Sequence, residues 1–170
     1  MQRNRKSAAR RARFPALLVA SWLSLSIVAN AADNAGETAP ASADHSNNAQ
    51  ILEPLALQGN AVAQFNLGVL HDVGRGVWQD HAAAARWYRL AAKQGHAAAQ
   101  FNLGGLYFDG LGVTRDLVRA SVWFTLAATT GFDGATRNRN SVATLLTADQ
   151  IAAVQQLARA CRQNNYADCD

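Results

Sequence analysis

The hexapeptide AQFNLG occurs twice in this sequence, at residues 63–68 and at residues 99–104, with the two starts 36 residues apart. Aligning residues 61–96 with residues 97–132 needs no gap and leaves 18 of the 36 positions identical. Self-similarity at a fixed period of this length is typical of stacked repeat proteins, in which each unit buries its apolar side against its neighbours. The repeat therefore predicts a stacked architecture built from two consecutive 36-residue units.

The first part of each unit has the spacing of a helix with one buried face. In the first copy that face carries Ala61, Gln64, Leu67, Gly68 and His71. Glycine is a poor helix former, yet the glycine at position 68 recurs at position 104. We interpret this recurrence as the mark of a second helix that crosses too closely to leave room for a Cβ atom.

A turn and a second helix complete each unit. Glycines that allow positive φ follow the first helix, at Gly74, Gly76, Gly110 and Gly112. Aspartates then stand where helix N-caps belong, at Asp80 and Asp116. The buried stripe of the second helix is Ala84, Trp87, Tyr88 and Ala91, and the stops are Gly95 and Gly131. Each unit is therefore predicted to be an antiparallel helical hairpin, so the fold is expected to be all-α.

The pattern extends beyond both copies. Residues 49–60 align with the second helix of the next unit and predict an N-terminal capping half-repeat. Residues 133–170 predict a degenerate C-terminal capping hairpin and tail, because arginines at positions 137 and 139 replace the apolar Phe101 and Leu103. Thr147–Gln150 reads as a capping box, and it opens a last helix with the inner stripe Ile151, Val154, Leu157, Ala158 and Cys161.

The N-terminal region reads as a secretory signal peptide over residues 1–31, with cleavage expected before Ala32. A basic start, a short apolar run and small residues at 29 and 31 support it, and a twin-arginine route through Arg10 and Arg11 stays open as the alternative to general secretion. Residues 32–48 are expected to be a flexible leader. Six of the sixteen basic residues precede Phe14, so the chain after residue 31 carries 10 − 12 = −2 charges, which argues against nucleic acid as a partner.

Two cysteines, Cys161 and Cys169, stand eight residues apart near the C-terminus. Export would place them where a disulfide persists, so we predict a bond that pins the tail to the last helix, with two free thiols as the alternative. The four histidines have no helical i, i+4 partner among themselves, so no metal or cofactor site is predicted.

The pattern AxAQFNLG…GxGV…D…AxxWYxxLAAxxG resembles the Sel1-like repeat, a relative of the tetratricopeptide repeat. The resemblance implies a right-handed α/α solenoid of antiparallel helical hairpins, capped at both ends. It also implies a non-enzymatic adaptor or regulator, in bacteria often of the cell envelope, that binds another protein or a peptide segment. A cysteine-rich branch of the family is associated with β-lactams or peptidoglycan fragments, but this chain lacks that branch's paired cysteines inside each repeat.

In such a solenoid the first helices line the concave side. We therefore predict partner-binding positions at Val62, Phe65, Asn66, Val69, Ala98, Phe101, Asn102, Gly105 and Phe108. A side-chain amide both donates and accepts, so the two asparagines suit a peptide backbone, although they and the phenylalanines equally suit packing between repeats. Trp78 lies in a turn, has Thr114 as its counterpart, and is a predicted exposed contact.

Two functional hypotheses follow from these features. The first is a periplasmic or secreted protein–protein interaction module without catalytic residues, without a stable membrane anchor after signal cleavage, and with weak self-association as a further option. The second is an envelope enzyme or binder acting on peptidoglycan fragments or β-lactams, which rests on compartment and family resemblance alone.

Overall fold

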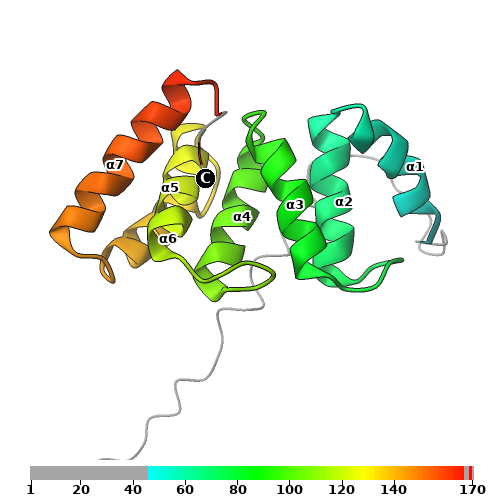
Figure 1. Cartoon of the computed structure of the whole chain (residues 1–170), viewed down its shortest axis with the longest axis horizontal. Coiled ribbons are helices and arrows are strands. Elements are labelled where there is room, and N and C mark those ends of the chain that lie inside the picture. Colours follow the sequence, from blue (N-terminus) through cyan, green and yellow to red (C-terminus); the bar gives the residue numbers. More distant parts are fainter. Residues whose placement is uncertain (1–45, 167–168, 170) are drawn as a thin grey trace, which may run out of the picture. The chain divides into compact units, whose positions relative to one another are not determined.

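The computed structural model describes residues 46–166 and residue 169, all within one compact unit that spans residues 38–170. Within the described residues the chain is all-helical, which confirms the predicted fold class. The helices are α1 (Ser46–Leu57), α2 (Ala61–Val73), α3 (His81–Ala92), α4 (Ala97–Asp109), α5 (Leu117–Thr129), α6 (Ala135–Ala143) and α7 (Ala148–Gln163) (Figure 1). The expected signal peptide (1–31) and most of the expected leader (32–48) lie outside the described residues.

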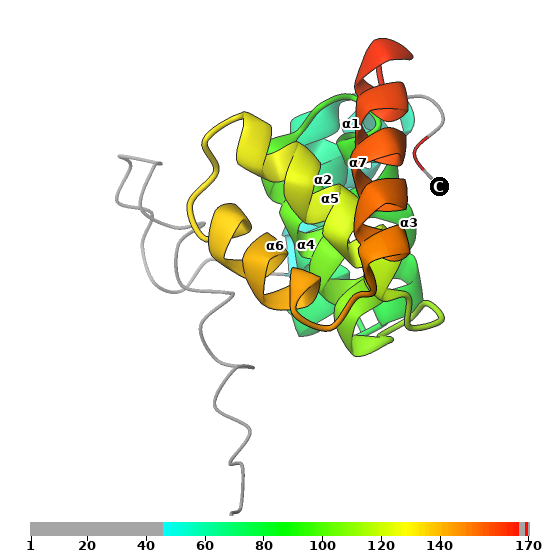
Figure 2. The same ribbon diagram turned by 90° about the vertical axis from the view of Figure 1, so that its left-hand side faces the viewer.

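Consecutive helices pack against one another along the chain. The pairs α2–α3 and α4–α5 are the two repeat hairpins, and α1 on α2 and α3 on α4 join neighbouring units. Helix α1 begins at Ser46, three residues before the expected half-repeat. Helices α6 and α7 each pack chiefly against α5 (Figure 2), so the C-terminal segment forms two separate contacts with the last repeat.

The two helical glycines lie where first and second helices approach most closely. A Cβ atom built on Gly68 would lie 2.6 Å from Cδ1 of Tyr88, closer than real Cβ contacts. One built on Gly104 would lie 3.0 Å from the ring of Phe124 and 3.2 Å from the carbonyl oxygen of Ala120. The close crossing predicted from the recurring glycine is confirmed in both repeats.

Turns and caps also follow the predicted pattern. Gly74 and Gly110 adopt φ of 71° and 74° at the ends of α2 and α4, in the left-handed region that favours glycine. Asp80 accepts a hydrogen bond of 2.9 Å from the Ala83 N–H, and this bond lowers the pKa of the carboxyl group. Asp116 caps α5 in the same way through Arg119 N–H at 3.0 Å.

His96 is a cap that the sequence did not single out. Its Nδ1 accepts a hydrogen bond of 3.2 Å from the Ala99 N–H at the start of α4, at the position where Asn60 caps α2 through Ala63. The His96 ring stacks on Phe65 with 4.6 Å between centroids. Burial of the ring lowers its pKa, so the neutral form that accepts the hydrogen bond is favoured.

Buried glutamines tie each first helix to the preceding second helix. Gln64 Nε2 donates to the carbonyl of Ala56 at 2.9 Å, and Gln100 Nε2 donates to the carbonyl of Ala92 at 3.2 Å. Gln94 Nε2 also donates to Gln64 Oε1 at 2.7 Å. The residue at the equivalent place in the second repeat is Thr130, and Gln100 Oε1 is buried without a hydrogen-bond partner.

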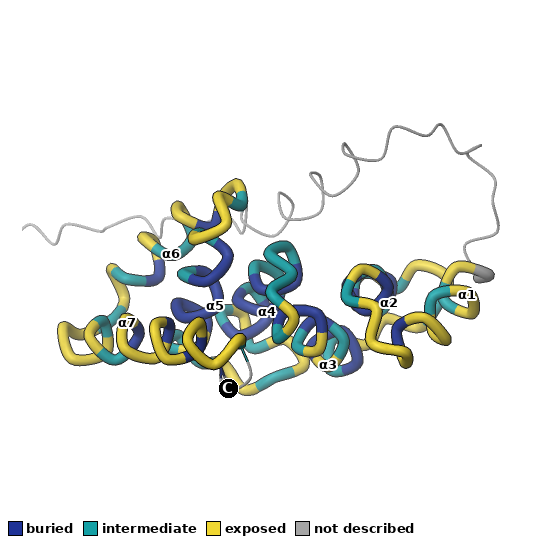
Figure 3. The backbone as a smooth tube through the Cα atoms, turned by 90° about the horizontal axis from the view of Figure 1, so that it is seen from above, coloured by how far each residue is buried: buried dark blue, intermediate teal, exposed yellow. Residues whose placement is uncertain are grey.

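Burial is greatest in the second repeat and falls toward both ends (Figure 3). Trp123 is fully buried in the main core, as predicted, whereas Trp87 is only half-buried against a smaller cluster shared by α1 and α2. Val154, Ala158 and Cys161 form the inner stripe of α7, but the prediction was wrong for Leu157, which is 49% exposed. At the end of the array α7 has no further unit to cover that position.

The predicted disulfide between Cys161 and Cys169 is present, with 5.0 Å between the Cα atoms. Both cysteines belong to the main core cluster, and Tyr166 packs against it. The Tyr166 ring lies 3.2 Å from a Cβ atom built on Gly95, in the connection between α3 and α4. The tail is therefore fixed to α7 by the covalent bond and to the repeat junction by an aromatic contact.

The adjacent glycines of α4 allow a matched test of the close crossing. Gly105 has no heavy atom within 4 Å of an added Cβ, so Gly105→Ala should raise the free energy of unfolding by about 1 kcal/mol through helix propensity. Gly68→Ala and Gly104→Ala gain the same propensity but overpack an aromatic ring, which costs about 1–3 kcal/mol. Urea denaturation followed by circular dichroism should rank Gly105→Ala above wild type and above both other variants. Equal stability of the three variants would contradict the close crossing.

Thr130→Gln should restore the glutamine pair in the second repeat. A glutamine at this position can donate to the unpaired Gln100 Oε1, as Gln94 does to Gln64, with an expected gain of about 0.5–1.5 kcal/mol in unfolding free energy. Thr129→Gln is the control, because both threonines donate their hydroxyl to a helix carbonyl three residues earlier. If both variants shift the denaturation midpoint equally, the pairing has no energetic role.

Protonation of His96 should weaken the fold. The pKa of this ring is lower in the folded state than the value of about 6.5 expected for an unfolded chain. The unfolded state therefore binds a proton more readily, and His96 lowers stability as the pH falls below about 6.5. Thermal unfolding measured between pH 7.5 and pH 5 should show a smaller loss in His96→Asn, which keeps an acceptor at the cap. The idea fails if the two proteins lose stability in parallel.

Candidate functional site

The open side of the first helices carries residues that share one helical face. On α2 these are Val62, Asn66 and Val69, of which Val62 is 58% exposed and the other two are half-buried. The equivalent positions of α4 are Ala98, Asn102 and Gly105, all half-buried. Spacing of four and three residues places each set on one stripe of its helix. We call these six positions the first-helix face.

The phenylalanines expected in the same groove instead pack within the fold. Phe65 is buried, because its ring lies between His96 and Tyr88 at centroid distances of 4.6 and 5.9 Å. Phe101 is half-buried against Phe124 and Phe132. These two rings fill the space between consecutive units, so we remove them from the proposed contact surface.

Phe108 is half-buried as well, and its ring is covered by a cation. The guanidinium carbon of Arg115 lies 5.8 Å from the ring centroid. The same arginine donates from Nε to the carbonyl oxygen of Phe108 at 2.9 Å. Phe108 is therefore engaged within its own repeat, and the first-helix face ends at Gly105.

A hollow of about 360 Å³ opens beside the first-helix face. Its lining is Asn48, Ile51, Leu52, Asn66, Val69 and Leu70. Two of these residues, Asn66 and Val69, were predicted from the sequence, and the three from α1 were not. The repeat alignment contained a signal for them, because it places Ile51 at the position of Trp87 and Leu52 at that of Tyr88.

A polar network behind the face distinguishes the first repeat from the second. Asp72 Oδ1 lies 2.8 Å from His81 Nδ1, and the Tyr88 hydroxyl donates to Asp72 Oδ2 at 3.1 Å. Burial, and next the Asp72 charge, raise the pKa of Tyr88 strongly, against a hydrogen bond from Asn102. The hydroxyl therefore stays protonated and acts as a donor. The second repeat has Phe108, Leu117 and Phe124 at the equivalent positions.

This network separates the two asparagines of the first-helix face. Asn102 reaches Tyr88 and so ties the second repeat to the first. No hydrogen bond joins the Asn66 side chain to another described residue, and this side chain borders the hollow. Asn66 is therefore the amide that is available to a ligand, whereas Asn102 has a structural partner.

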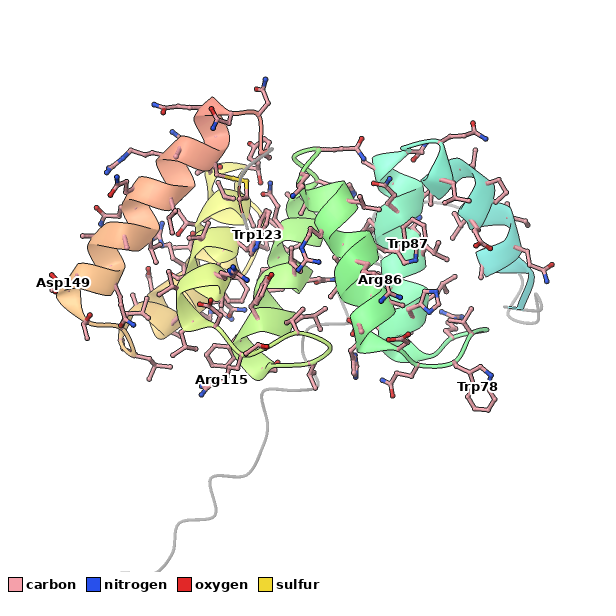
Figure 4. The ribbon with its side chains drawn as sticks, in the orientation of Figure 1. Trp78, Arg86, Trp87, Arg115, Trp123 and Asp149 are labelled. Carbon is pink, nitrogen blue, oxygen red and sulfur yellow. A yellow bond between two sulfur atoms is a disulfide. The ribbon has the colours of Figure 1, made fainter. Side chains whose placement is uncertain are left out.

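Trp78 lies in the connection between α2 and α3 and is 94% exposed. Figure 4 shows its side chain pointing away from the ribbon, in contrast to Trp123, which lies among the packed helices. Its neighbour Gln79 fixes the loop by donating to the carbonyl of Asp72 at 2.8 Å. The tryptophan is thus presented on an anchored turn.

Within residues 46–166 and residue 169, no group of three or more His, Cys, Asp or Glu side chains is placed to hold a metal ion. None of the helices that the structure describes has both the length and the apolar character needed to cross a membrane.

Comparison with known proteins identifies the repeat. The family model described as Sel1 repeat matches residues 61–96 and residues 97–132, the intervals that the two hairpins occupy. Sel1 repeats generally serve as protein–protein interaction modules, and proteins built from them are generally non-catalytic scaffolds. Comparison with curated proteins gives no match.

Two solved structures share the architecture. The first is c5321, described as a protective antigen present in uropathogenic Escherichia coli strains displaying an SLR fold, with a TM-score of 0.70 and 36% identity over 76% of this chain and 28% of that one. The second is a Sel1 repeat protein from Oxalobacter formigenes, with a TM-score of 0.54 and 35% identity over 55% of this chain and 39% of that one. The present chain thus spans well under half the length of either protein. Its two family-model matches and this common fold show that it is a Sel1-repeat protein with two tandem repeats.

Proposed function

We propose that this protein is a non-catalytic adaptor or regulator of the bacterial cell envelope that binds a segment of another protein across its first-helix face. The observation that carries the proposal is the open stripe of α2, where two valines flank an asparagine without a described partner. A solvated helix face is normally polar, and apolar residues beside a polar amide suit a peptide, which presents both side chains and backbone amides.

The surrounding geometry supports binding on this side of the helices. The hollow beside Asn66 and Val69 offers depth for a side chain, with Ile51 and Leu52 as apolar walls. Farther along the face, Gly105 leaves open space above α4, so a bound segment can approach the backbone there. Trp78 stays a predicted additional contact, since an exposed tryptophan supplies a large apolar area.

The envelope location rests on the disulfide between Cys161 and Cys169. Disulfides of this kind persist in oxidising compartments and are rare in the bacterial cytosol. The signal peptide expected over residues 1–31 agrees with export, so we propose a periplasmic or secreted protein.

Gly105 allows the face to be blocked without straining the fold. Gly105→Arg places a long side chain into the open space, and Gly105→Ala keeps the face clear as the matched control. Photo-crosslinking in envelope extracts, followed by mass spectrometry, should identify a partner captured by wild type and by Gly105→Ala. Capture by Gly105→Arg should fall at least tenfold, and Asn66→Ala should weaken it by roughly three- to tenfold for one lost hydrogen bond. Asn102→Ala is unsuitable, because it also disturbs Tyr88.

An unchanged partner profile from folded Gly105→Arg would place the interaction elsewhere on the protein. Trp78→Ala, measured in the same experiment, reports whether the anchored turn takes part in binding.

A further inference from the structure

Helix α1 occupies the position of a second helix in the repeat register. The backbone carbonyl of Ala56 accepts from Gln64, as the carbonyl of Ala92 accepts from Gln100 in the next unit. Both carbonyls are eight residues before their glutamine, and α1 packs on α2 as α3 packs on α4. Shifting the sequence by 36 residues therefore superimposes the role of α1 on that of α3 and α5.

The face of α1 that has this role is largely uncovered. In α3 and α5 the corresponding stripe is packed under a first helix, with Tyr88 and Phe124 against Gly68 and Gly104. The residue at the Trp123 position is fully buried in α5, half-buried as Trp87 in α3, and 63% exposed as Ile51 in α1. Leu55 is 43% exposed, although its counterparts Ala91 and Ala127 are fully buried.

We propose that this uncovered face of α1 is the docking position for one amphipathic helix of another protein, a helix that has small residues and an aromatic ring in the pattern of α2. The repeat itself specifies the occupant, because the same second-helix surface is covered by a helix of that pattern in both complete units. The surface is separate from the first-helix face, and the inference stands without the proposed function.

The position of Phe65 locates the aromatic ring of the partner. Phe65 lies against His96 at the start of the next unit, and 36 residues earlier the His96 position is Asn60. A first helix on α1 would set its ring beside Asn60 and Val62, and Val62 is exposed. Leu52 stands where Tyr88 stands in the complete unit, and this smaller side chain leaves the hollow next to it open.

The occupant comes from another polypeptide for two reasons. Residues 1–45 contain no copy of the AQFNLG motif. The two copies that the chain does contain lie in α2 and α4, and both are already packed between their own second helices. A second copy of the protein would have to unfold a repeat to supply one.

The opposite end of the array does not offer a comparable surface. There α7 presents mainly polar and charged residues to solvent, among them Gln155, Gln156, Arg159 and Arg162. Terminal units of a solenoid need such a polar outer side to stay soluble. The apolar stripe of α1 is therefore the property of an interface and not of a cap.

A peptide with the α2 sequence, residues 60–74, serves as the probe for this surface. Short helices are marginal in water, so the peptide is cross-linked through its positions 62 and 66, which lie on its open face. Fluorescence anisotropy with the full-length protein should detect binding. The double variant Ile51→Glu, Leu55→Glu should weaken it at least tenfold, whereas Leu145→Glu, Leu157→Glu, with two similarly exposed leucines of the C-terminal segment, should leave it unchanged.

Two further variants keep the test independent of folding defects. Ile51→Trp restores the aromatic residue of the complete units and should tighten binding. A peptide with Phe65→Asp should bind at least tenfold more weakly. Absence of peptide binding, or binding that ignores the Ile51 and Leu55 changes, would overturn the proposal. So would a dimer in sedimentation that Ile51→Glu dissociates, because the occupant would then be a second copy.

Discussion

The contact between a helical glycine and an aromatic ring of the following helix fixes the geometry of each repeat. Gly68 meets Tyr88 and Gly104 meets Phe124 at distances that exclude a Cβ atom. Because the second helix lies so close, its small residues are fully buried and the glutamine of the first helix reaches the carbonyl of the preceding unit. The hairpin, the junction and the stacking direction all depend on this one approach.

The two repeats use the same backbone arrangement with different interiors. Repeat 1 places a carboxylate, an imidazole and a phenol where repeat 2 places Phe108, Leu117 and Phe124. Buried polar groups require complete pairing, and in repeat 1 the Asp72 carboxylate provides it for Tyr88. Repeat 2 gains apolar burial instead and holds the fully buried Trp123. The more deeply buried core therefore lies in the second half of the array, and the less covered surface lies at α1 and α2.

Local signals in the sequence were sufficient wherever a residue type has one strong physical reason to occur. The recurring glycine, the aspartate caps, the capping box and the cysteine pair were all predicted and all found. The candidate site was predicted less well. Val62, Asn66 and Val69 line an open face, but Phe65 turned out to be buried, and the α1 residues of the hollow were missed. Periodicity assigns a residue to a side of its own helix, and it does not tell which neighbour covers that side.

The sequence alone therefore determined the repeat length, the all-helical hairpin and the family, because these follow from spacing and from residues with restricted backbone or capping roles. Tertiary structure decided which apolar positions are covered. Ile51, Trp87 and Trp123 occupy one position of the repeat, yet they range from mostly exposed to fully buried. Exposure depends on the helices packed on both sides, and for identical repeat positions those neighbours differ between the end and the middle of the stack.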